Sequence, residues 1–348
     1  MKSFLKYAVF ASVSVFAMFG VSHAGEVGVS SFTFNATHRD MPVQVLVWYP
    51  AVGGGRNETM GGDAVFVGTK VKREAKPEGG KHPLIILSHG SGGNAFNLGW
   101  ISARLVEEGY IVMSPNHPGS TSGDSSPETN IMAWERPQDV SALLDAITAS
   151  HGWQSHVDES NITAMGFSLG GYTALATAGA RVHASDYATY CDTHAKAMDC
   201  TWFEQGNSYI KGHVDLHKID ASKFDGDYHD DRITRVVAID PGFAQAFTAE
   251  SLASIKQPTL VLNLGSIGSV PLGVEGKRVA ETIPHANYTN VDGANHFTFL
   301  GVCKTFGWIA LLFDGDDPVC TEVSDRHRVD MHEEIANKII AFLKGKNS

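Results

Sequence analysis

The chain has few basic residues and no closely spaced cysteines. Its 27 lysines and arginines stand against 38 aspartates and glutamates, which gives a net charge of −11 at pH 7. A shortage of positive charge argues against polyanionic partners, so we predict no nucleic-acid ligand and no binding to an anionic membrane. None of the four cysteines has the Cys-x-x-Cys spacing of a structural zinc site.

Long apolar runs are absent after the first 24 residues. Two lysines near the start precede an apolar run at 7–21 and a small-residue site at 22–24, which is the three-part layout of a signal peptide. The run is short for a bilayer span and no second one follows, so we predict no stable membrane anchor. Removal of residues 1–24 leaves one secreted or periplasmic domain, 25–348, with 25 basic and 38 acidic residues and a charge of −13.

The cysteines fall into two local pairs, Cys191 with Cys200 and Cys303 with Cys320. An oxidising compartment makes two local disulfides the natural pairing, although four cysteines allow three pairings. Three histidines between the two pairs have spacings that do not place them on one helical face: His213, His217 and His229. We therefore predict no metal site.

The rest of the chain alternates between strand and helix patterns. Strands are predicted at 27–34, 41–49, 83–88, 110–113, 162–166, 235–239, 259–263 and 288–291. Helices are predicted at 98–108, 137–149, 170–178, 249–255, 274–283 and 329–343. The first two strands form an antiparallel pair, and a glycine-rich loop follows them. Alternation over this length predicts an α/β fold, a mostly parallel sheet with helices on both faces.

Residues 181–231 interrupt the alternation. This segment is rich in His, Asp, Tyr and Lys and contains the first cysteine pair. It follows the predicted helix 170–178, at the edge of the sheet where ligands bind in such folds. We expect a cap-like insertion; a surface excursion without substrate contact is the alternative.

Ser168 stands between Gly166 and Gly170, after a predicted strand and before a helix of small residues. This pattern is typical of a sharp turn that presents a nucleophilic serine. Glycines are needed there because neighbouring backbone passes too close for a Cβ. The turn also directs the Leu169 amide toward a substrate carbonyl oxygen, beside the positive end of the helix. A chance match of a short pattern is the alternative.

A serine hydroxyl needs a base and a carboxylate, in the chain order Ser, acid, His. His296 is the best of sixteen histidines for the base, because it follows the last predicted strand directly. The acid is often found after the strand that is here 259–263, but residues 264–271 contain no carboxylate. Asp240, at the end of strand 235–239, is therefore our candidate acid. It could instead only cap a turn with Pro241.

Several other residues have smaller expected roles. Glu275 is the second candidate for the acid, although it is expected inside a helix. His327 and His332 flank the last helix and are expected at the surface. The glycine-rich loop after strand 83–88 predicts that the Ser91 backbone amide is a second oxyanion donor, and His89 beside it is expected to be structural.

Five segments carry a family resemblance: 88–93, 116–119, 136–140, 166–171 and 293–297. With them the chain resembles the α/β-hydrolase superfamily over roughly residues 32–342. It is similar in particular to the bacterial group called predicted dienelactone hydrolases, which is related to platelet-activating-factor acetylhydrolases. The resemblance implies an acid on the earlier strand, as at Asp240, and a disulfide from each cysteine pair. Dienelactone hydrolases proper use a cysteine nucleophile, whereas this chain has Ser168.

These observations predict a serine carboxylic-ester hydrolase that works through an acyl-enzyme without a cofactor. Its partner would be a small-molecule or lipid ester, and the oligomeric state is not predicted. A secreted serine peptidase and a non-catalytic binding protein of the same fold are the alternatives. Seven aromatic residues are expected mostly in the core, with an acyl pocket as the alternative: Trp202, Phe203, Tyr209, Phe224, Phe297, Phe299 and Trp308.

Overall fold

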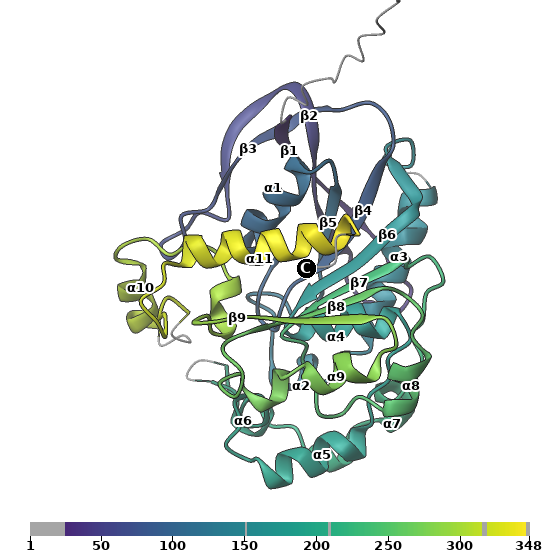
Figure 1. Ribbon diagram of the computed structural model, residues 1–348, viewed down its shortest axis with the longest axis vertical. Helices are drawn as coiled ribbons and strands as arrows, with labels where there is room; N and C mark the ends of the chain where they lie inside the picture. The colour runs from purple at the N-terminus through teal and green to yellow at the C-terminus, as the bar shows by residue number, and fades with distance from the viewer. Residues whose placement is uncertain (1–24, 150–151, 208–209, 315–318, 346–348) are drawn as a thin grey trace, which may run out of the picture.

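The computed structural model describes residues 25–149, 152–207, 210–314 and 319–345 (Figure 1). The predicted signal peptide, 1–24, lies outside these residues. Nine strands form one sheet in the order β1-β3-β2-β5-β4-β6-β7-β8-β9. No helix within the described ranges is long and apolar enough to cross a membrane.

The strands are β1 (Glu26–Phe34), β2 (Val43–Met60), β3 (Thr69–Pro77), β4 (His82–Ser88), β5 (Ile111–Asn116), β6 (Val157–Phe167), β7 (Arg235–Ile239), β8 (Thr259–Leu264) and β9 (Ala286–Val291). The helices of the sheet framework are α1 (Gly99–Glu107), α2 (Pro127–Asn130), α3 (Glu135–Ala149), α4 (Leu169–Thr177), α8 (Ala249–Ser254), α9 (Lys277–Thr282), α10 (Gly307–Asp314) and α11 (Arg328–Leu343). Short 3-10 turns include η1 (Ala95–Leu98), η3 (Leu272–Val274) and η4 (His296–Phe299).

Strands β4 to β9 run parallel to one another, whereas β2 pairs antiparallel with both β1 and β5. The apolar runs of β4, β7 and β8 are buried on both faces because helices cover each side. Apolar residues of α1 and α11 pack on one face of the sheet. Those of α3, α4, α8 and α9 pack on the other. The predicted mostly parallel, two-faced α/β sheet is confirmed.

The prediction of a glycine-rich loop after residue 49 is wrong. Strand β2 continues to Met60, and β3 returns antiparallel beside it, with a register shift between Ala51 and Gly54. Strand β3 buries Val71 and Ala75 but is otherwise charged or polar. With so few apolar positions, its sequence carries only a weak strand pattern, and pairing with β2 determines the structure.

The segment 181–231 is helical, with α5 (Ala184–Thr193), α6 (Met198–Gln205), η2 (Leu216–Lys218) and α7 (Ala221–Phe224). These elements lie at the bottom of Figure 1. Tyr187, Phe203 and Phe224 are buried and pack edge-on or stacked against Phe243, which follows β7. The insertion therefore shares the core on the α4 side of the sheet.

The seven aromatic residues that the sequence places mostly in the core differ in how far they are exposed. Phe203, Phe224 and Phe299 are core residues, as expected. Trp202 and Phe297 are half-buried, and Trp308 is 51% exposed, so it is not a core residue. Tyr209 lies outside the described residues.

Both cysteine pairs form disulfides, Cys191–Cys200 between α5 and α6 and Cys303–Cys320 after η4. The surface placement expected for His332 is wrong. Its ring is only 6% exposed, stacks on Trp100 and donates from Nε2 to the Thr298 carbonyl. His332 lies three residues before Ile335 on α11, on the same face as the buried Ile335 and Ile339.

Candidate active site

The turn at Ser168 has the strained geometry that the sequence predicts. Ser168 has φ 57° and ψ −121°, a region that non-glycine residues rarely occupy. A Cβ on Gly166 would lie 2.0 Å from the Gly170 carbonyl oxygen, and one on Gly170 would lie 2.0 Å from that of Ser88. Both glycines are therefore required for β4, β6 and α4 to meet, and Ser168 is left half-buried at the meeting point.

Ser168, His296 and Asp240 are joined by hydrogen bonds; we call the turn 166–170 the elbow and this set of three residues the elbow triad. His296 Nε2 lies 3.1 Å from Ser168 Oγ, and His296 Nδ1 lies 2.8 Å from Asp240 Oδ2. A carboxylate only accepts hydrogen bonds, so the proton of the neutral imidazole is on Nδ1 and Nε2 is free to accept from the serine. His296 is 8% exposed and Asp240 is fully buried.

The carboxylate of Asp240 is held by residues at the end of β8, the strand after which the acid is often found. Its Oδ1 accepts hydrogen bonds from the Leu264 amide and from Asn263 Nδ2, both at 2.8 Å, at the end of β8. Asp240 itself has φ 43°, so its backbone is strained to aim the carboxylate at His296. Glu275 lies before α9 and not inside it, and its carboxylate accepts from the Lys277 amide. The role of Asn263 was not predicted.

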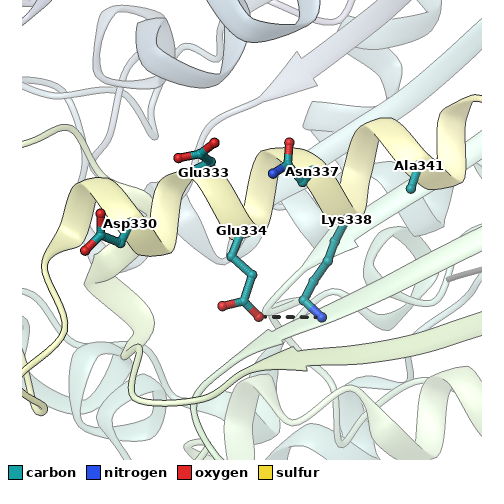
Figure 2. Close-up of a pocket in the computed structure, with 6 residues that line it drawn as sticks. All are labelled: Asp330, Glu333, Glu334, Asn337, Lys338 and Ala341. Atoms are coloured by element: carbon teal, nitrogen blue, oxygen red, sulfur yellow. Dashed lines mark ion pairs between the residues drawn. The ribbon is translucent and has the colours of Figure 1, made fainter.

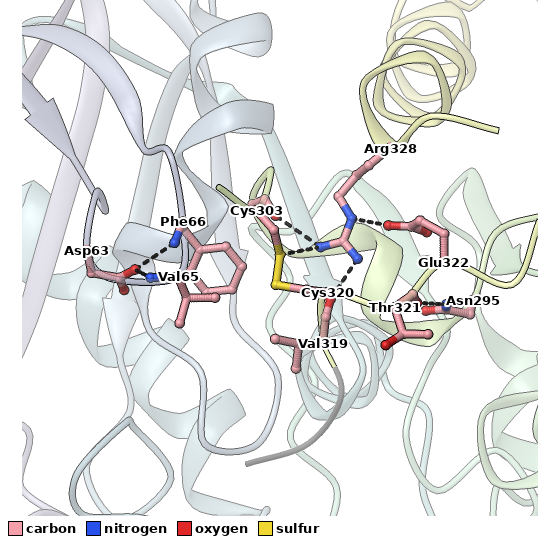
Figure 3. Close-up of a disulfide and its surroundings, with 11 residues drawn as sticks. Asp63, Val65, Phe66, Asn295, Cys303, Val319, Cys320, Thr321, Glu322 and Arg328 are labelled. Atoms are coloured by element: carbon pink, nitrogen blue, oxygen red, sulfur yellow. Dashed lines mark hydrogen bonds and ion pairs between the residues drawn. A yellow bond between two sulfur atoms is a disulfide. The ribbon is translucent and has the colours of Figure 1, made fainter. Parts of the chain in front are cut away.

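The His296 turn, η4, is held from the segment that follows the second disulfide (Figure 3). Asn295 caps the turn, and its Nδ2 donates to the Thr321 carbonyl at 2.7 Å. Thr298 donates to Glu322 at 3.1 Å. Arg328, which is 6% exposed, pairs with Glu322 and donates to the Val319 carbonyl. The Cys303–Cys320 disulfide and Arg328 thus hold segment 319–322 in place, and this segment holds the turn that carries His296.

The Leu169 amide belongs to a peptide whose carbonyl is firmly held. The Ser168 carbonyl accepts from the amides of Gly171, Tyr172 and Gly242 at 2.8 to 3.2 Å. The N–H and C=O of a trans peptide point in opposite directions, so these bonds fix the direction of the Leu169 N–H. It stands at the first turn of α4, where no helical acceptor exists.

The Ser91 amide is oriented in the same way. The Gly90 carbonyl accepts from His89 Nδ1 at 2.7 Å and from the Gly93 amide at 3.1 Å. His89 Nε2 accepts from the His117 amide at 3.2 Å, which forces the His89 proton onto Nδ1. Gly90 packs on the elbow, since a Cβ there would lie 3.2 Å from Ser168 Cβ. The Ser91 and Leu169 amides therefore flank the elbow with fixed orientations.

A second Ser–His–Asp set, not predicted from the sequence, lies behind this loop; we call it the buried triad. His117 Nε2 lies 3.1 Å from Ser88 Oγ, and His117 Nδ1 lies 2.8 Å from Asp139 Oδ2. All three side chains are at most 2% exposed. Burial, and after it the charge of Arg136, lowers the pKa of His117 to about 3. Asp139 is buried, but hydrogen bonds from Arg39, His117 and His38 hold its pKa well below the usual range.

Two surface hollows lie away from the elbow. One runs along α11 and is lined by Asp330, Glu333, Glu334, Asn337, Lys338 and Ala341 (Figure 2). The other lies between the α5–α6 turn, 192–199, and η3. No residue of the elbow triad lines either hollow, and within the described ranges no group of three His, Cys, Asp or Glu side chains is placed to hold a metal.

Comparison with known proteins places the chain in a family. A model of the alpha/beta hydrolase family matches residues 85–302, a span that contains the whole elbow triad. A ferulic acid esterase from Streptomyces cinnamoneus is similar in structure, with a TM-score of 0.61 and 16% identity over 94% of this chain and 93% of the esterase. At that identity, the likeness shows the fold alone.

A structure from Bacteroides ovatus described as a "putative dipeptidyl aminopeptidase IV" also matches. Its TM-score is 0.48 at 11% identity, over 92% of this chain and 36% of that structure. This similarity is too low to support an argument about activity. No curated protein sequence matches the chain significantly.

Proposed function

Because the chain belongs to the alpha/beta hydrolase family, we propose that it is a serine hydrolase of carboxylic esters that works through an acyl-enzyme. The observation that carries this proposal is the hydrogen-bonded line from Ser168 through His296 to Asp240, at a strained turn flanked by two oriented amides. Nucleophile, base and orienting acid thereby have the mutual geometry that acyl transfer requires.

In the first half-reaction, Ser168 Oγ attacks the ester carbonyl carbon while its proton passes to His296 Nε2. The carbonyl electron pair moves onto the oxygen, where the Leu169 and Ser91 amides stabilise the negative charge. Collapse of this intermediate expels the alcohol, which takes the proton from His296 and leaves an acyl group on Ser168. Asp240 holds the imidazole by Nδ1 and stabilises its charged form.

In the second half-reaction, His296 takes a proton from water, and the hydroxide attacks the acyl-serine. The same two amides stabilise the second oxyanion, and His296 returns the proton to Ser168 Oγ as the acid leaves. Loss of one such donor typically raises the barrier by about 3 kcal/mol. The bonds that hold the Ser168 and Gly90 carbonyls therefore contribute to the rate, although less than the triad side chains do.

We further propose that the insertion 181–231 is a cap at the entrance. The His213 amide, within the insertion, donates to Glu128 of α2 at 2.8 Å. Asn130, at the other end of α2, donates to Ser91 Oγ at 2.6 Å. The insertion is thus two contacts from the loop that carries the second oxyanion donor, a place from which it can shape substrate access.

Export of the protein is part of the proposal. Two disulfides form in the described chain, and such bonds persist in oxidising compartments outside the cytosol. Together with the leader pattern at 1–24, they support a secreted or periplasmic enzyme. The position of Asp240 after β7, and not after β8, supports the subgroup of predicted dienelactone hydrolases and platelet-activating-factor acetylhydrolases.

A matched pair of chromogenic substrates tests the reaction class. We expect the purified protein to hydrolyse p-nitrophenyl esters and to leave p-nitroanilides of the same acyl groups untouched. Feruloyl esters, phospholipids and p-nitrophenyl esters of increasing chain length then define the acyl specificity. Turnover of the anilides at a rate comparable to the esters would assign the protein to the peptidases, and no turnover of any ester would contradict the proposal.

A further inference from the structure

Arg136, on α3, is a buried arginine without an ion pair. It is 1% exposed, and none of the ion pairs found in the described chain includes it. Its neighbour Asp139 is occupied by Arg39, His38 and His117. Burial lowers the pKa of Arg136 to about 9, so it is still charged at neutral pH. The charge of Asp139 nearby opposes this lowering of the pKa, but burying a cation without a direct ion pair is still unfavourable, which calls for another reason for its presence.

Its three donors bind three different segments. Nη2 donates to the His89 carbonyl, Nη1 donates to Ser120 Oγ at 2.8 Å, and Nε donates to Thr173 Oγ1 at 3.1 Å. His89 begins the loop that carries Ser91, and Thr173 lies one turn into α4. A single rigid group therefore spans the two elements that supply the oxyanion donors.

The effect on the Ser91 amide follows from the order of the peptides. Arg136 holds the His89 carbonyl, and His89 Nδ1 holds the Gly90 carbonyl. Two consecutive peptide planes are therefore fixed, and the second of them carries the Ser91 N–H. On the other side, Thr173 accepts from Arg136 and donates to the Leu169 carbonyl at 3.0 Å.

We propose that Arg136 is a positioning residue of the oxyanion hole, which sets the placement of the Ser91 loop relative to α4 and so relative to the Leu169 amide. It touches no substrate in this role. The inference rests on the proposed ester hydrolysis, since it concerns the same site.

The consequence is a loss of transition-state stabilisation with little change in substrate binding. A displacement of about 1 Å between catalytic groups can reduce the rate about 100-fold. We expect Arg136→Met to lower kcat per active site about 100-fold, with KM changed less than about threefold. Arg136→Lys keeps the charge but its single ammonium cannot reach three segments, so we expect a loss of about tenfold.

The test compares these variants with Arg232→Met. Arg232 also ties segments together, binding Asp230, Asp145 and the Ser141 carbonyl, but it lies away from the elbow and is 35% exposed. Active-site titration with a p-nitrophenyl ester first normalises every rate to folded, acylatable protein. Inhibition by a phenylboronic acid, whose serine adduct is tetrahedral, then reports the oxyanion hole directly.

For both Arg136 variants we expect Ki for the boronic acid to rise in proportion to the fall in kcat/KM, while Arg232→Met changes neither. Arg136→Lys keeps this test decisive if Arg136→Met does not fold. Normal kcat per titrated site and normal Ki in Arg136→Lys would overturn the positioning role. Failure of the wild-type protein to be acylated would instead contradict the proposed function itself.

Discussion

Two Ser–His–Asp triads lie at the ends of neighbouring strands in this molecule. In the elbow triad and the buried triad alike, the histidine Nε2 lies 3.1 Å from the serine and Nδ1 lies 2.8 Å from the carboxylate. The difference is in the surroundings. Ser168 is half-buried on a strained turn beside two oriented amides, whereas Ser88 is 2% exposed within the core. Triad distances alone do not define an active site.

The two carboxylates also differ in their partners. Asp240 binds His296, Asn263 and the Leu264 amide. Asp139 also pairs with Arg39 and with His38, and so joins the first loop of the chain to α3. The buried triad is therefore a structural network, and it connects to the elbow through the contact of the His117 amide with His89.

The largest expected difference between the triads is in the serines. Ser168→Ala should lower kcat about 10⁶-fold because the nucleophile is lost. Ser88→Ala should keep activity within about tenfold and lose about 1 kcal/mol of unfolding free energy with one hydrogen bond. Steady-state hydrolysis of p-nitrophenyl acetate and urea unfolding measure these effects. Equal activity losses in the two variants would remove the distinction between the triads.

The carboxylates give the next contrast. Asp240→Asn should lower kcat about 10⁴-fold, the scale known for this change in other serine triads, because the wrong imidazole tautomer is favoured. Asp139→Asn should mainly destabilise the fold, by about 3 kcal/mol, because the buried Arg39 loses one of its two charge partners and keeps only Glu135. Glu275→Gln serves as the control with normal activity. A large loss in Glu275→Gln instead would identify Glu275 as the acid.

The disulfides give a third contrast, because only Cys303–Cys320 adjoins the segment that holds the His296 turn. Cys303→Ser with Cys320→Ser should lower kcat per titrated site about tenfold, because Thr321 and Glu322 then hold η4 less firmly. Cys191→Ser with Cys200→Ser should leave kcat unchanged. Both double variants should lose about 2 to 3 kcal/mol of stability. If the double variant at Cys303 and Cys320 changes only the melting temperature, the position of His296 does not depend on that disulfide.

Acid stability concerns the fold as a whole and not the reaction rate. Burial lowers the pKa of His332 to about 4 and that of His117 to about 3, from 6.5. Below pH 6.5 the unfolded chain therefore binds more protons than the folded one, and stability falls as pH decreases toward these values. His332 alone accounts for about 3 kcal/mol between pH 6.5 and pH 4.

Unfolding in urea at pH 7, 5.5 and 4.5 should show this decline, and it should be shallower in His332→Phe. The phenyl ring keeps the stacking on Trp100 and removes the titrating group. The same slope in His332→Phe and the wild-type protein would show that His332 contributes nothing to acid sensitivity.

The geometry around the elbow could largely be predicted from the sequence. Gly166, Ser168 and Gly170 are adjacent in sequence, and the empty loop after β8 led to Asp240 by elimination. The two amides proposed as oxyanion donors follow from the positions of loops at strand ends. Here, short-range pattern and chain order were sufficient.

The buried side was not predictable, because its contacts join residues far apart in the chain. Ser88, His117 and Asp139 come from β4, β5 and α3, and no local spacing indicates which of sixteen histidines meets which carboxylate. Strand β3 was missed because its pairing partner determines it. His332 could have been placed correctly, since its spacing from Ile335 puts it on the apolar face of α11.

The most direct test of the central claim is to identify the acylated residue. The protein is mixed with p-nitrophenyl acetate, quenched in acid within milliseconds, digested and examined by mass spectrometry. We expect a single acetyl group on the peptide that contains Ser168, and none on the peptide that contains Ser88. Acetylation at any other residue, or rapid turnover with no acetyl group on Ser168, would contradict the account.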